Sequence, residues 1–211
     1  MNAKGLHLVP PPPGLQDFTT VLRGKEVPVQ RFYQIGTILD QGDKPHCGGY
    51  AACQLLQSEP IPQKPATGDT IYKRAKTLDG LPRGVDGTTI FAVVKALEAL
   101  GFIKDQFYAF TADQVFDYVA STSPVIVGSH WFDSMDNPSG TGQVKAKGRS
   151  SGGHAYLCHG VDFVSKRVYF TNSWGKNWGK DGTFWMSHKE FARAFDNRGM
   201  VAAAVHEIKV R

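Results

Sequence analysis

The chain has 211 residues, of which 41% are hydrophobic and 20% charged. These fractions are ordinary for a globular protein and exclude a wholly disordered chain, and no run approaches the ~18 apolar residues that a membrane-spanning helix needs. The formal net charge of +5 comes from 24 basic and 19 acidic residues that are scattered along the chain. Such a charge pattern predicts neither a nucleic-acid partner nor a membrane partner.

The cysteine content indicates a reducing environment. There are three cysteines, Cys47, Cys53 and Cys158, and an odd, small number does not make a disulfide framework. Residues 1–10 lack the pattern of an export signal. We therefore expect a cytoplasmic protein or one associated with a virion.

The first part of the chain predicts an extended lead-in followed by helices. Residues 27–38 are mixed apolar and polar, and a loop from Asp40 to His46 follows them. An apolar run from Cys47 to Gln57 predicts a helix, and Pro60 lies just beyond its end.

Three further helices are predicted by their capping residues. Asp69 is expected to cap one that Gly80 closes, and Thr88 or Thr89 to begin the next. Thr111 with Gln114 has the spacing of a capping box before a third.

The rest of the chain predicts mainly strands. The capping-box pair Ser187 and Glu190 opens one short helix there, and a glycine-rich loop at residues 132–153 is long enough to suggest a functional role. The expected strands are Pro124–Gly128, His154–Phe163, Arg167–Asn172, Thr183–Met186 and Met200–Val210.

Helices followed by strands imply an α+β protein with two lobes that meet near residue 120. We expect an N-terminal extension and lead-in at residues 1–30. A helical lobe would span residues 31–120, and a β-rich lobe residues 121–211.

Three separated residues form a candidate catalytic group. Cys47 stands at a loop-to-helix junction, where the unpaired amides of the first helical turn favour a thiolate. His154 begins a strand and can exchange protons with a thiol. Asn172 ends a strand and can orient the imidazole, while Trp174 can shield that hydrogen bond from water. Taken singly, each residue is also compatible with a structural role, such as a buried cysteine or a polar turn.

Three sequence blocks resemble the motifs of papain-like cysteine peptidases. The first is Gln41-Gly42 followed by Cys47, the second is Gly153-His154-Ala155, and the third is Asn172-Ser173-Trp174-Gly175 with Trp178-Gly179. The resemblance extends from about Ile35 to Glu190. It implies a papain-like fold, with a helical lobe and an antiparallel β-barrel-like lobe on either side of a cleft.

The resemblance also implies roles for individual residues. Cys47 would be the nucleophile, His154 the general acid and base, and Asn172 the residue that orients the imidazole. Gln41 would donate its side-chain amide to the oxyanion, together with the backbone N–H of Cys47.

Other residues are expected to line the cleft or to have no catalytic role. Extended substrate would lie along Asp86-Gly87, with Gly153 and Trp174 beside it. Cys158-His159 is too small a group for a metal site, and no metal or cofactor is expected.

The chain departs from the family's secreted members. Gly48-Gly49-Tyr50 follows Cys47 in place of the usual C-G-[SA]-C-[WY] pattern, disulfide partners are missing, and no long N-terminal inhibitory segment is visible. These features resemble bacterial or phage-type members.

The leading hypothesis is an endopeptidase acting on polypeptides. The alternatives are a Cys-His amidase, including a peptidoglycan hydrolase or acyl transferase, and a non-enzymatic component of a virion or other assembly. The Asn-Ser-Trp-Gly block favours the first, and the presence of all four catalytic residue types argues against the last. His46, beside Cys47, is a further candidate base.

Overall fold

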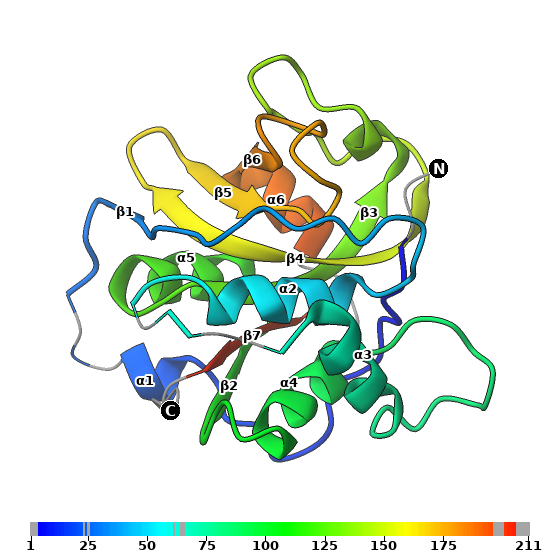
Figure 1. Ribbon diagram of the computed structural model, residues 1–211. Helices are drawn as coiled ribbons and strands as arrows, with labels where there is room; N and C mark the ends of the chain where they lie inside the picture. Colours follow the sequence, from blue (N-terminus) through cyan, green and yellow to red (C-terminus); the bar gives the residue numbers. More distant parts are fainter. Residues whose placement is uncertain are drawn as a thin grey trace.

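The computed structural model describes residues 4–22, 24, 26–60, 62–63, 66–195 and 201–205. Helices α2, α3 and α4 lie below a twisted antiparallel sheet, and α2 crosses in front of that sheet (Figure 1). The helical elements are α1 (Thr19–Leu22), α2 (Cys47–Leu56), α3 (Gly68–Lys76), α4 (Ile90–Ala99), α5 (Ala112–Ser121), the 3₁₀ turn η1 (Asp133–Asp136) and α6 (His188–Phe195). The strands are β1 (Gln30–Phe32), β2 (Gln106–Ala109), β3 (Val125–Phe132), β4 (Ser150–Asp162), β5 (Arg167–Thr171), β6 (Thr183–Ser187) and β7 (Val201–Val205).

The sheet is organised around the long strand β4. Its described strands lie in the order β2-β7-β3-β4-β5-β6, and β1 adds to the far end of β4. All strand pairs are antiparallel, with Ser129 opposite His154 and Leu157 opposite Thr171. Because β3, β5 and β1 all hydrogen-bond to β4, the strand that carries His154 is held from both sides.

The helix caps follow the sequence signals with one correction. Thr89 caps α4, and Thr111 forms the predicted capping box with Gln114. The prediction that Asp69 caps α3 is wrong, because Thr67 accepts the hydrogen bond from the amide of Thr70 and places Asp69 in the first turn. Asp69 still complements the positive end of the helix there.

Most predicted strands are confirmed, but the structure extends two of them. β3 and β4 run past their expected ends, so the predicted loop at residues 132–153 is partly strand and includes η1. Its backbone is also pinned, because Ser134 Oγ donates to the carbonyls of Lys145 and Lys147. β2 had no clear sequence signal. The last predicted strand is found at Val201–Val205, and its remainder lies outside the described residues.

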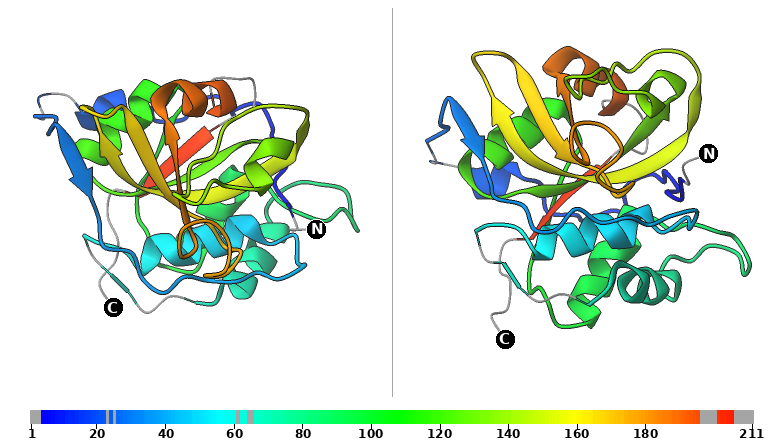
Figure 2. Two further views of the ribbon diagram at one scale, coloured as in Figure 1. Left: turned by 90° about the horizontal axis from the view of Figure 1, so that it is seen from above. Right: turned by 45° about the horizontal axis from the view of Figure 1, so that its top comes forward.

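Two hydrophobic clusters lie on opposite faces of the sheet, and Figure 2 separates the helical layer from the β-rich layer. One cluster joins α2, α3 and α4 to the near face, including Leu157 of β4. The other places α5 and α6 against the far face, around Trp131 and Tyr156. No helix of the described chain is long and apolar enough to cross a membrane.

Candidate active site

The three predicted catalytic residues come from three different elements. Cys47 is the first residue of α2, His154 lies within β4, and Asn172 directly follows β5. A fourth residue, Gln54 of α2, donates its side-chain amide to the Asn172 carbonyl at 3.1 Å. Gln54 therefore ties the helix of the nucleophile to the strand end that carries the orienting amide. Sequence reasoning missed it, because a lone glutamine in a helix has no distinguishing pattern.

The imidazole of His154 is held in one orientation. Its Nε2 lies 2.8 Å from Asn172 Oδ1, and that oxygen also accepts a hydrogen bond from the Ser173 amide. The Trp174 ring is tilted by 32° to the imidazole at 4.6 Å between centroids, and the Trp131 and His154 rings meet edge to face at 4.7 Å. The other ring nitrogen, Nδ1, is buried and has no hydrogen-bond partner among the described residues.

Burial dominates the protonation of both reacting groups. It lowers the pKa of His154 to about 4, while the hydrogen bond to Asn172 acts in the opposite direction. Burial likewise raises the pKa of the Cys47 thiol, although the backbone of Ala155, Gly5 and Gly48 hydrogen-bonds to the sulfur and works against that rise. In this arrangement the thiol and the imidazole are therefore both neutral near pH 7. The sequence-based expectation of a lowered Cys47 pKa is wrong for this state, because it took account of the helix start but not of a cover.

Gln41 belongs to the loop that precedes Cys47. Its Nε2 donates to the Lys44 carbonyl at 2.7 Å, and its Oε1 accepts from Ser173 Oγ at 2.6 Å. Its backbone N–H also donates to the Ser173 carbonyl. Gln41 is 1% exposed, so these bonds join the loop before Cys47 to the turn that carries Asn172.

His46 is turned toward α3 and away from the catalytic group. Its ring stacks on Tyr72 with 3.6 Å between centroids, and its Nδ1 lies 2.8 Å from Asp69 Oδ1. Lys44 and His46 together hold the pKa of Asp69 at about 2. This carboxylate therefore positions the loop before Cys47, and His46 has the role of a structural tether.

The two remaining cysteines have structural surroundings. All three cysteines are free and buried, and burial raises the pKa of Cys53 to about 11 and that of Cys158 further. The described residues contain no group of three or more His, Cys, Asp or Glu side chains that could hold a metal ion.

A segment of the chain's own N-terminal region, residues 4–9, lies over the nucleophile, and we call it the covering segment. The Leu6 amide donates to the Gly153 carbonyl at 3.3 Å. On the other side, the Thr88 amide donates to Gly5 and the His7 amide to Thr88, both at 2.8 Å. The covering segment thus pairs with backbone from both walls, antiparallel to Gly153 and parallel to Thr88.

Close backbone approach explains the glycines at this crossing. A Cβ on Gly5 would overlap the carbonyl oxygen of Pro45, and one on Gly87 would overlap the carbonyl oxygen of Gly5. Gly87 also has φ +84°, a conformation that favours glycine. Gly153 is similarly close to the Leu6 carbonyl. The predicted substrate-lining residues Gly87 and Gly153 therefore face an extended peptide, which here is the covering segment.

Side chains at both ends fix the covering segment. Leu6 is 6% exposed and packs against Ile90 and the backbone of Gly128. Lys4 Nζ forms an ion pair with Asp136 Oδ1 at 3.1 Å, and Asp136 also accepts from the Trp131 indole. The His7 ring bonds to the carbonyl of Asp86 at 2.7 Å. Cys47 itself is completely buried. Asp136, which lies within the predicted loop at residues 132–153, thus anchors the covering segment.

Sequence reasoning missed the covering segment. Residues 4–9 contain only the brief alternation Leu6-His7-Leu8, and their docking depends on backbone hydrogen bonds that any sequence can make. The pairing partners, Gly153 and Thr88, are far away in the chain. The one available signal was Gly5, which stands directly before Leu6-His7-Leu8.

Comparison with solved structures shows that the chain has the papain-like fold. No protein-family profile and no curated protein sequence matches the chain. The likeness therefore rests on the three-dimensional arrangement of α2 and the sheet. It confirms the α+β, papain-like fold predicted from the sequence blocks.

Three solved structures illustrate the likeness. Xylellain, a cysteine protease from Xylella fastidiosa, is 18% identical with a TM-score of 0.78, and the match covers 99% of this chain and 97% of that one. ProCathepsin B S9 from Trypanosoma congolense is 10% identical with a TM-score of 0.71, over 98% of this chain and 87% of that one. Bromelain from Ananas comosus, solved with the E64 inhibitor, is 15% identical with a TM-score of 0.61, over 82% and 94%.

Proposed function

We propose that the chain is a cysteine endopeptidase that cleaves polypeptides through an acyl-enzyme. The observation that carries this proposal is the hydrogen bond of 2.8 Å between His154 Nε2 and Asn172 Oδ1. The other ring nitrogen of His154, Nδ1, has no hydrogen-bond partner among the described residues. In β4, the strand that carries His154, the backbone of the next residue, Ala155, hydrogen-bonds to the Cys47 sulfur. Nucleophile, base and orienting group thus occur in one buried cluster, as acyl transfer requires.

The chemistry follows from these positions. His154 takes the proton of the Cys47 thiol, and the thiolate attacks the peptide carbonyl carbon. The backbone N–H of Cys47, which has no partner within α2, and the Gln41 amide are the proposed donors to the oxyanion. The C–N bond breaks as His154 protonates the leaving amine. Water, deprotonated by His154, then cleaves the thioester to a carboxylic acid and restores the thiol.

The covering segment makes the described state a closed one. It fills the position over the sulfur that substrate needs, and its burial of His154 and Cys47 keeps both groups uncharged. Activity therefore requires release of residues 4–9. We infer that substrate binds along the same two walls, at Thr88 and Gly153, because these backbone groups already pair with an extended chain.

A peptide-library digest tests the function. The full chain, a Leu6→Ala variant that weakens the cover, and Cys47→Ala are each incubated with the library and the products are identified by mass spectrometry. Cleavage that is faster with Leu6→Ala and absent with Cys47→Ala supports the proposal, as does a peptide adduct on Cys47. Equal product formation by Cys47→Ala contradicts it. Products formed only from cell-wall cross-link peptides or only by amine exchange identify the related amidase or acyl transferase.

A further inference from the structure

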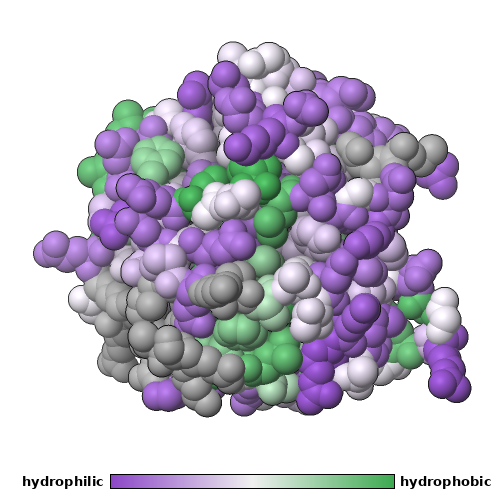
Figure 3. Space-filling view, viewed as in Figure 1, coloured by the Kyte–Doolittle hydropathy of each residue, from purple (hydrophilic) through white to green (hydrophobic). Residues whose placement is uncertain are grey.

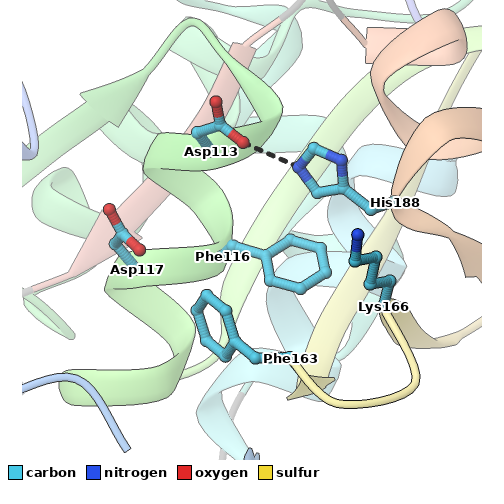
Figure 4. Close-up of a pocket in the computed structure, with 6 residues that line it drawn as sticks. All are labelled: Asp113, Phe116, Asp117, Phe163, Lys166 and His188. Atoms are coloured by element: carbon cyan, nitrogen blue, oxygen red, sulfur yellow. Dashed lines mark hydrogen bonds and ion pairs between the residues drawn. The ribbon is translucent and has the colours of Figure 1, made fainter. Parts of the chain in front are cut away.

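A hollow of about 470 Å³ lies on the far side of the sheet from α2. We call it the α5 hollow. Figure 4 shows that its walls come from α5, from the turn between β4 and β5, and from the start of α6. It is lined by Asp113, Phe116, Asp117, Phe163, Lys166 and His188. None of these residues belongs to the catalytic group or contacts the covering segment through a described hydrogen bond.

The α5 hollow contains one carboxylate without a counter-ion. Asp113 has a hydrogen-bond partner, because its Oδ1 lies 2.7 Å from His188 Nε2. The Asp117 carboxylate has no ion pair or side-chain hydrogen bond within the described residues. It is partly buried, and this burial, together with the nearby Asp113, raises its pKa. A cation beside the Asp117 carboxylate would favour its charged form and so offset both the burial and the repulsion from Asp113.

Aromatic rings form the floor beside Asp117. Phe116 and Phe163 meet edge to face at 5.2 Å, and Phe116 meets the His188 ring in the same way at 4.7 Å. Figure 4 shows these rings between Asp117 at one end and Lys166 at the other. A carboxylate next to aromatic faces is the combination that holds an ammonium or guanidinium on an apolar stem.

An exposed apolar rim continues from the α5 hollow. Phe163 donates its backbone N–H to Val29 at 2.9 Å, and Val29 and Val164 are 63% and 80% exposed. Figure 3 shows apolar atoms at the upper left edge, where Figure 1 places β1 and the β4–β5 turn. A free small amine would leave this rim uncovered, whereas a polypeptide can cover it.

We propose that the α5 hollow binds a lysine or arginine side chain of a partner polypeptide, whose neighbouring apolar residues cover Val29 and Val164. The basic group pairs with Asp117, and its stem lies against Phe116 and Phe163. Lys166 stands at the opposite end, so its charge opposes a basic ligand without blocking the acidic end.

Two charge-changing variants give opposite predictions. Asp117→Asn keeps the shape of the side chain and removes the pairing charge. Lys166→Gln removes the opposing charge at the other end. The matched control is Asp105→Asn, which removes the same charge from an exposed site outside the α5 hollow. All three are made in the Cys47→Ala chain, so that the result does not depend on whether the protein cleaves peptides.

The probe is a fluorescein-labelled peptide with the sequence Gly-Leu-Arg-Leu-Gly, compared with a copy that carries uncharged citrulline in place of arginine. Binding is measured by anisotropy at low salt. We expect the arginine peptide to bind about three- to tenfold more tightly than the citrulline peptide. Asp117→Asn should remove this difference, Lys166→Gln should preserve or enlarge it, and Asp105→Asn should leave it unchanged.

Several results would overturn the proposal. They are equal binding of both peptides, absence of binding, or an Asp117→Asn chain that still discriminates them while unfolding at the same temperature as the parent. Competition by free agmatine, a guanidinium on a butyl stem, at the concentration needed for the unlabelled arginine peptide would identify a small-amine site and overturn the polypeptide assignment. Weaker competition by agmatine supports it.

Discussion

Replacing Leu6 with alanine tests whether the covering segment controls access to Cys47. The Leu6 side chain is 6% exposed and contacts Ile90 and Gly128. Removing such a side chain from its burial site costs about 2–3 kcal/mol. We expect the rest of the chain to stay folded when the segment leaves, so this cost acts on docking. The open population should therefore rise about 30- to 150-fold.

The assay is alkylation of the full chain by iodoacetamide at pH 7, with each thiol followed by mass spectrometry. We expect labelling of Cys47 to accelerate by the same 30- to 150-fold factor, while Cys53 and Cys158 stay slow. Val164→Ala, at a side chain that is 80% exposed, is the control and should have no effect. Cys47 labelling that is equally fast in the parent and in Leu6→Ala would refute the reasoning. Faster labelling of all three thiols would show global unfolding instead.

Three further predictions concern the catalytic group and the fold. In the Leu6→Ala background, His154→Ala should lower turnover of a cleaved peptide by about 10²–10⁴-fold, because a proton carrier is lost. Asn172→Ala should lower turnover only about tenfold, because one orienting hydrogen bond is lost. Equal losses would contradict this division of roles. Docking of the covering segment should weaken as the pH falls from about 6.5 to 4, since the docked state holds the pKa of His154 at about 4 and the released state binds its proton near the ordinary value. Hydrogen-exchange protection of the Leu6 amide, compared with exposed amides, should fall about a hundredfold over that range, and constant protection would count against the linkage. Thr111→Ala should destabilise the fold by about 1 kcal/mol through loss of the α5 cap, read as a lower urea midpoint, and an unchanged midpoint would show that the cap contributes nothing.

The sequence predicted the elements whose signals are local. The capping box at Thr111 and Gln114 needs only residues three apart, and it is present. The α3 cap was misplaced because Thr67 and Asp69 both suit a helix start, and backbone geometry decides between them. β2 has four residues and depends on pairing with β7, which lies far away in the chain. Pairing of that kind leaves no local pattern to detect.

The candidate site was predictable where chemistry restricts residue type. Cys47, His154 and Asn172 stand in blocks whose residues have few common alternatives, and the structure brings His154 and Asn172 into hydrogen-bond contact. The contacts that close the site were not predictable. They use the backbone of Gly5 and Thr88, and backbone groups are the same in every residue. Burial raises the pKa of Cys47, so its direction could not be read from the helix start alone.

The tether between the covering segment and the rest of the chain has a kinetic consequence. A segment joined to its own binding site competes at an effective concentration that is commonly on the order of millimolar. A peptide in solution must displace this built-in competitor. Its apparent affinity is therefore its affinity for the open state multiplied by the fraction of molecules that are open. Dilute polypeptides would therefore be cleaved slowly, and turnover would rise where polypeptides are concentrated or where another molecule pulls residues 4–9 away.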